Sequence, residues 1–112
     1  MSVAGLYLYD IGKLAEKLSK EFGALPYEKF AEDTEKIESA VRSLVIMKER
    51  WSWLRPNVRQ QLVPIDWCAV TGKWDRKTGR HVGVDAKQLW ETIAQKIPEM
   101  SGKAEELLKR QS

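Results

Sequence analysis

The sequence predicts a mostly α-helical fold with a small β-hairpin, and three observations support this. Long stretches repeat apolar residues every three to four positions, which is the spacing of one face of a helix. That spacing is lost between residues 55 and 84, where prolines and Thr-Gly pairs mark turns. The chain has 112 residues, 43% of them hydrophobic, so we expect a single small helical domain over residues 1–112.

The first predicted helix covers about residues 5–22. Ile11, Leu18 and Phe22 share one face at helical spacing, and lysines and glutamates fill the opposite face. Gly23 follows directly, and glycine is the residue that most often ends a helix. These signals predict an amphipathic helix whose apolar face is turned toward the core.

The second predicted helix covers residues 26–54, because Pro26 suits a first helical turn and Pro56 stops a helix just before it. Apolar residues recur along it by alternating threes and fours, which is typical of a narrow helix–helix seam. Unbroken, the helix would be roughly 43 Å long, whereas a domain of this size is only roughly 34 Å across. We therefore expect that it breaks in the forties or that its end packs against another chain. The predicted protein-interface residues are Phe30, Ile37, Val41, Leu44 and Trp51.

A small β-hairpin is predicted in the 64–84 region. Residues 65–70 alternate apolar and polar side chains, as a half-buried strand does, and residues 80–84 supply a second strand. Gly72 and Gly79 each follow a threonine and are turn signals between the two strands. A lone hairpin is only marginally stable in water, so we expect this one to lean on the helices.

The third main helix is predicted over residues 86–97. Asp85 and Gln88 have the spacing of a helix-capping pair, and Pro98 ends or kinks the helix. Ser101 then suits the start of a short C-terminal helix. The sequence thus predicts three main helices, a short last helix and the hairpin.

The net charge of +3 is concentrated in the irregular middle of the chain. Residues 55–84 hold six Lys or Arg but only two Asp, so this stretch carries the whole positive excess. Trp74 stands among these cations, and an aromatic ring flanked by cations suits stacking on unpaired bases while the phosphates are neutralised. The predicted nucleic-acid-binding residues are Arg55, Arg59, Lys73, Trp74, Arg76, Lys77 and Arg80.

The same grouping of Trp and Arg has two other interpretations. Both residue types are enriched at the centres of protein interfaces, and a cation can also lie over an aromatic ring of its own chain. The sequence does not decide between single-stranded and double-stranded nucleic acid. The partners we expect are nucleic acid and either a second copy of the chain or another protein.

Catalytic chemistry has one candidate pair, Cys68 and His81. A thiolate beside an imidazole is an activated nucleophile, and a hairpin over residues 64–84 would bring the two together. We favour a structural interpretation, with Cys68 as a small buried side chain and His81 as a surface residue of a basic loop. Paired carboxylates such as Glu35 and Glu38 are interpreted as solvated helix faces. We therefore predict no catalytic residue, no metal site and no cofactor.

These observations favour a non-enzymatic subunit of a nucleoprotein assembly, which binds nucleic acid through the hairpin and docks through its second helix. The first alternative is a protein–protein adaptor with no nucleic-acid role, and the second is a Cys/His enzyme. No apolar run approaches the ~18 residues of a membrane span, and no secretory signal precedes the first helix. A single Cys suits a reducing compartment, so we expect a cytoplasmic protein.

Overall fold

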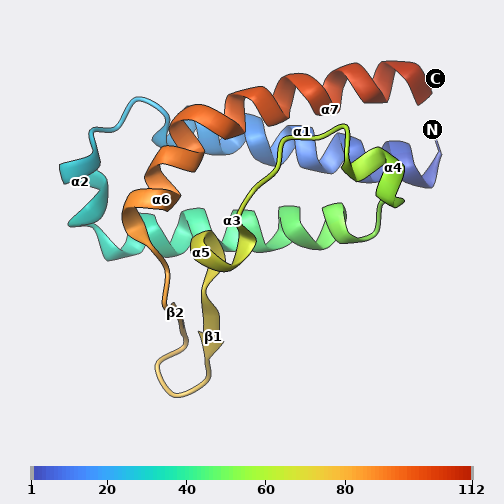
Figure 1. Ribbon diagram of the computed structural model, residues 1–112. Helices are drawn as coiled ribbons and strands as arrows, with labels where there is room; N and C mark the ends of the chain where they lie inside the picture. Colours follow the sequence, from blue (N-terminus) through green and yellow to red (C-terminus); the bar gives the residue numbers. More distant parts are fainter. Residues whose placement is uncertain (1, 112) are drawn as a thin grey trace.

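The computed structural model describes residues 2–111 and confirms a mostly α-helical fold with a small two-stranded hairpin (Figure 1). Its elements, in chain order, are α1 (Val3–Phe22), α2 (Tyr27–Ala31), α3 (Thr34–Ser52), α4 (Pro56–Arg59), α5 (Trp67–Thr71), β1 (Lys73–Asp75), β2 (Arg80–Val82), α6 (Ala86–Glu91), the π-helical turn η1 (Thr92–Lys96) and α7 (Ile97–Gln111). The long helix α1 packs against both α7 and α3, and these three helices form the bundle. The hairpin projects from the side of the bundle formed by α3.

The helix α1 begins slightly earlier than the sequence pattern predicts. The Ser2 side chain accepts a hydrogen bond from the backbone N–H of Gly5 and so caps the first turn. Its predicted apolar face is buried, with Leu8, Ile11 and Leu18 at 1% exposure or less. A Cβ atom placed on Gly12 would lie only 3.7 Å from the Cβ of Ala104. Small residues at these two positions therefore allow α1 and α7 to approach closely.

The predicted helix over residues 26–54 is interrupted, and the break lies at residues 32–33 rather than in the forties. The Asp33 side chain accepts a hydrogen bond of 3.1 Å from the backbone N–H of Lys36, which starts α3 as a new helix. An aspartate that caps a turn competes with helix continuation, and this outweighs the continuous apolar seam. The resulting helix α3 is roughly 28 Å long, so helix length gives no reason to expect a partner chain.

Residues 65–70 form no strand, which is the second difference from prediction. Asp66 accepts a hydrogen bond from the backbone N–H of Ala69 and starts the short helix α5. Trp67, Val70 and Thr71 are its buried residues, and their spacing is helical. Alternation over so few residues fits either structure, and the capping aspartate decides for the helix.

The hairpin itself is shorter than predicted but lies within the expected region. β1 and β2 are antiparallel and pair Lys73 with Val82, Trp74 with His81, and Asp75 with Arg80. No residue of either strand or of the tip between them belongs to the buried core. The hairpin is therefore an appendage held by contacts to the bundle, chiefly to α3.

The C-terminal region is one helical segment rather than two separate helices. After α6, the backbone N–H of Ile97 donates to the carbonyl of Thr92, a five-residue step that widens the helix by one π turn. Pro98 lies directly after this turn, and because it has no backbone N–H it leaves one hydrogen bond of the continuous segment unmade without ending the helix. The predicted break at Pro98 is therefore only a local widening.

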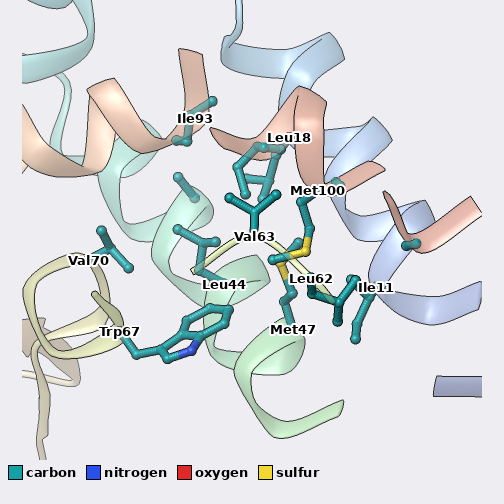
Figure 2. Packing of buried hydrophobic residues seen from close by; sticks show 14 of the residues in the cluster. Ile11, Leu18, Leu44, Met47, Leu62, Val63, Trp67, Val70, Ile93 and Met100 are labelled. Carbon is teal, nitrogen blue, oxygen red and sulfur yellow. The ribbon is translucent and has the colours of Figure 1, made fainter. Parts of the chain in front are cut away.

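The irregular segment between α4 and α5 closes the core. Leu62 and Val63 are buried in the same cluster as Met47 of α3 and Met100 of α7 (Figure 2). This anchoring places Trp67 against the bundle and so fixes the start of the hairpin. In the described part of the chain, no helix has the length and apolar character needed to cross a membrane.

Candidate active site

The candidate site is built around His81, the single histidine of the chain. Its Nδ1 lies 2.9 Å from Oε1 of Glu38, and its backbone N–H donates to Oε2 of the same carboxylate at 3.4 Å. Glu38 belongs to α3 and His81 to β2, so the pair joins the hairpin to the bundle. The two side chains are only 8% and 11% exposed.

The environment of Glu38 keeps its carboxyl group ionised. Burial raises the pKa of Glu38, but the hydrogen bonds from His81 and the charges of His81 and Arg42 outweigh it, so the net pKa lies below its usual value. A carboxylate that accepts from Nδ1 fixes the orientation of the imidazole ring. It also leaves Nε2 as the ring nitrogen available for proton transfer.

Three neighbours complete the surroundings of this pair. The ring of Trp74, which is His81's partner across the hairpin, lies 5.2 Å from the imidazole in an edge-to-face arrangement. Arg42 lies one turn after Glu38, with Nε 3.9 Å from Oε1. Arg80 reaches Glu35 at 3.2 Å, a second contact between the hairpin and α3.

The tip of the hairpin presents cations to solvent. The Asp75 carboxylate accepts hydrogen bonds from the backbone N–H of Lys77 and from the Thr78 hydroxyl, which shapes the turn. Within residues 2–111, Lys73, Arg76 and Lys77 have no ion-pair partner. The described geometry thus brings an oriented imidazole, an exposed Trp and unpaired cations together on one small element.

The other residues predicted to bind nucleic acid lie elsewhere. Arg55 and Arg59 flank or belong to α4, at the far end of α3 from the hairpin (Figure 1). The seven predicted nucleic-acid-binding residues therefore fall into a hairpin group (Lys73, Trp74, Arg76, Lys77 and Arg80) and an α4 pair.

The residues predicted for a protein interface face inward. Phe30, Val41 and Leu44 are fully buried in the protein's own core, and Ile37 and Trp51 are half-buried against it. The apolar seam on α3 thus packs within the chain, which corrects the expectation that this seam faces a partner.

The interpretations of Cys68, His81 and Glu38 also need correction. Cys68 is exposed on α5 rather than buried. The neighbour that the hairpin brings to the His81 ring is Trp74. His81 is largely buried rather than a free surface residue, and Glu38 is a buried carboxylate rather than a solvated one. Glu38 is one turn from Val41 on the apolar side of α3, and this placement is the signal that would have found it.

Comparison with known proteins identifies the family. A protein of Caldanaerobacter subterraneus subsp. tengcongensis, provisionally named an RNase, is 29% identical over 105 residues, or 94% of either chain. A protein of Thermococcus cleftensis named "Probable ribonuclease HepT" is 31% identical over 104 residues, which are 92% of this chain and 94% of the relative. The chain belongs to the HepT ribonuclease family. No family model matches it, and no solved structure matches it significantly.

Membership of the HepT family overturns the prediction of a non-enzymatic protein. Both relatives carry ribonuclease names and align along nearly their full lengths, so the nucleoprotein-subunit and adaptor interpretations are wrong. The error arose because the sequence offers only one histidine and no pattern that joins it to a carboxylate 43 residues earlier. Among the described residues, no group of three or more His, Cys, Asp or Glu side chains is placed to hold a metal ion.

Proposed function

We propose that this HepT-family protein is a ribonuclease that cleaves single-stranded RNA at the hairpin, with His81 as its proton-transfer group. The observation that carries the proposal is the 2.9 Å contact between His81 Nδ1 and the Glu38 carboxylate. An imidazole oriented by a carboxylate is a common general base. The names of the two relatives supply the reaction class.

The reaction that fits these groups is attack of a ribose 2′-oxygen on the adjacent phosphorus. Nε2 of His81 takes the proton of the 2′-hydroxyl, the new P–O2′ bond forms, and the P–O5′ bond breaks. In-line displacement puts O5′ on the far side of phosphorus from the nucleophile, so a water molecule protonates the leaving oxygen. The products are a 2′,3′-cyclic phosphate and a 5′-hydroxyl, and the imidazolium returns its proton to solvent.

The cations of the hairpin have a separate part in this reaction. Charge accumulates on the non-bridging phosphate oxygens during attack, and Lys or Arg within reach stabilises it. Lys73, Arg76 and Lys77 have no ion-pair partner among the described residues and so remain available. Trp74 is 56% exposed and offers a stacking surface for an unpaired base, which favours single-stranded substrate.

The test is cleavage of a labelled single-stranded RNA by wild type and by His81→Ala. We expect wild type to yield fragments ending in a 2′,3′-cyclic phosphate, and we expect His81→Ala to lose about 10²-fold or more of the rate. The same sequence as DNA should resist cleavage because it lacks the 2′-hydroxyl.

The matched control is Val82→Ala, which removes an exposed side chain next to His81 on the same strand. It should retain nearly the wild-type rate, and thermal unfolding should show that both variants are folded. Full cleavage by a folded His81→Ala protein would contradict the assignment of His81, and no cleavage by wild type would contradict the function.

We also propose that the chain self-associates through the outer face of α1 and α3. Leu6 of α1 and Ile46 of α3 are 52% and 43% exposed, and Trp53, 51% exposed, follows directly after α3. The Asp10–Arg50 ion pair of 3.0 Å bridges the two helices between these apolar residues. An exposed apolar patch of this kind marks an interaction surface.

A further inference from the structure

A hollow lies beside α4 and is lined by Trp51 and Arg59. It has a volume of about 410 Å³, within the usual range of ligand pockets. Its walls are largely apolar and include no acidic residue. The lining residues are Trp51, Pro56, Arg59, Gln60, Leu62, Val63 and Pro64.

Arg59 is the charged group of this hollow and lacks a counterion among the described residues. Its guanidinium lies over the ring of Trp51, with Cζ 5.1 Å from the ring centroid. Its Nε is buried and donates to no acceptor, and within residues 2–111 Arg59 forms no ion pair. A buried donor without an acceptor and a half-buried charge without a counterion both cost free energy in the unliganded protein. A ligand with negative charge would supply the missing counterion and so remove the second of these costs.

A ring contact links the hollow to the segment that leads into the hairpin. Trp51 contacts Trp67 at 5.7 Å between ring centroids, and Trp67 begins α5, which leads directly into β1. Trp51 and Glu38 also lie on the same helix, thirteen residues or about 20 Å apart. A single strand of roughly three to six nucleotides spans such a distance, at about 3.4 Å per stacked nucleotide or more when extended.

We propose that this hollow is a subsite for one base of the RNA strand whose phosphate is cleaved at His81, an inference that rests on the proposed function. The base lies flat against the Arg59 guanidinium, on the side away from Trp51, between the walls formed by Pro56 and Pro64. The positive charge of Arg59 and of neighbouring Arg55 matches the adjoining phosphates, and guanidinium planes are established stacking surfaces for unpaired bases.

The experiment measures binding of a short 2′-O-methyl oligoribonucleotide, which cannot be cleaved because its 2′-oxygens are blocked. Fluorescence anisotropy gives its affinity for wild type and for Arg59→Gln, which removes the charge and shortens the side chain. We expect about tenfold weaker binding by Arg59→Gln, the scale of one lost stacking contact. The control, Lys29→Gln, makes the same charge change on α2 at the other end of the bundle and should leave affinity nearly unchanged.

A scan of single abasic positions in the oligonucleotide identifies the bound base. One position should weaken binding to wild type about tenfold and should have no further effect on Arg59→Gln. Arg59→Lys keeps the charge but lacks the planar group, so it should keep the wild-type salt dependence while losing sensitivity to the abasic position. Thermal unfolding shows whether each of the three variants is folded. If Arg59→Gln does not fold, Arg59→Lys tests the proposal in its place.

The outcomes separate this inference from the proposed function. RNA cleavage by wild type together with unchanged affinity of Arg59→Gln would overturn the base subsite and leave the ribonuclease proposal intact. Absence of cleavage, together with matching losses from Arg59→Gln and one abasic position, would support the subsite and contradict the ribonuclease proposal. Absence of binding by wild type even at low salt would overturn the subsite.

Discussion

Glu38 and His81 illustrate how a single pair of residues connects the hairpin's position with its chemistry. The carboxylate accepts both the backbone N–H of His81 and its Nδ1–H, so the same group holds the strand and orients the ring. Because both side chains are largely buried, the contact is shielded from water and salt. Loss of the carboxylate should therefore affect stability and cleavage together.

Glu38→Gln gives a pH-dependent prediction for stability. In the folded state the pKa of Glu38 lies below its ordinary value of 4.5, so the folded protein binds fewer protons there than the unfolded chain does. The stabilisation is complete above pH 4.5 and is lost as the pH falls through the folded-state pKa. Urea unfolding from neutral to acidic pH should show Glu38→Gln less stable than wild type at neutral pH, with the difference narrowing in acid.

The control for this measurement is Glu99→Gln, which changes an exposed carboxylate in the first turn of α7. Its stability should follow wild type across the whole range. A Glu38→Gln deficit that stayed constant down to acidic pH would show that the loss is steric rather than ionic. Cleavage by Glu38→Gln should fall at all pH values at which wild type is active, because an uncharged amide stabilises the imidazolium less well.

At this scale the sequence identified the hairpin cations but missed Glu38, the buried carboxylate that holds His81. Lys73, Arg76 and Lys77 could be predicted as exposed because unpaired charges are too costly to bury. Glu38 could not, because its burial depends on a strand 43 residues later folding back over α3. One-dimensional spacing carries no information on such a contact.

The individual elements follow from local signals where those signals are strong. The amphipathic pattern of residues 5–22 and the cap at Asp85 both produced helices near the predicted positions. The breaks at Asp33 and Asp66 were missed because each is a single capping residue inside an apolar pattern that continues past it. Capping contributes about 1 kcal/mol, which is enough to decide between patterns that otherwise fit equally well.

The junction between α5 and β1 yields a prediction at the scale of elements. Gly72 has φ +58° and ψ −147°, a conformation that only glycine adopts readily, and a Cβ there would overlap the carbonyl oxygen of Val82. Gly72→Ala should therefore destabilise the protein by about 1–3 kcal/mol or more. Because the overlap is with the opposite strand, the change should also displace the hairpin and abolish cleavage.

Gly79→Ala is the matched comparison, since Gly79 also has a positive φ, +68°, but nothing lies within 4 Å of its added Cβ. It should cost only about 1 kcal/mol and leave most of the cleavage rate. Urea unfolding and the RNA cleavage assay measure the two effects. Equal losses from the two variants would show that backbone strain alone, rather than the contact with Val82, matters.

At the scale of the whole molecule, α1 and α3 carry the exposed apolar side chains of Leu6 and Ile46, and Trp53 is exposed directly after α3. Tyr7 and Trp53 contact each other at 5.2 Å between ring centroids, and the guanidinium of Arg50 lies 5.0 Å from the Trp53 ring. These contacts restrain the Trp53 side chain, which lowers the side-chain entropy lost when a partner binds. A second copy of the chain is the partner we propose for these exposed side chains.

Sedimentation velocity at micromolar concentration tests this association. Wild type should sediment as a dimer, and Ile46→Asp should shift it to a monomer because a charge would be buried in the contact without a counterion. Val82→Asp makes the same kind of change at an exposed position on the hairpin and should remain dimeric. A monomeric wild type would contradict self-association through this face.

The absence of core residues from the hairpin has a consequence for how this protein can diverge. The free energy of folding resides in the bundle, whereas the side chains proposed to meet RNA stand on strands and a tip that add nothing to the buried cluster. Substitutions at the tip can therefore accumulate with little penalty in folding, provided that Gly72 and the two carboxylate contacts to α3 persist. In such a scaffold, substrate preference can change without compensating substitutions in the core. A library of variants confined to residues 76–79 is therefore the natural place to search for altered specificity.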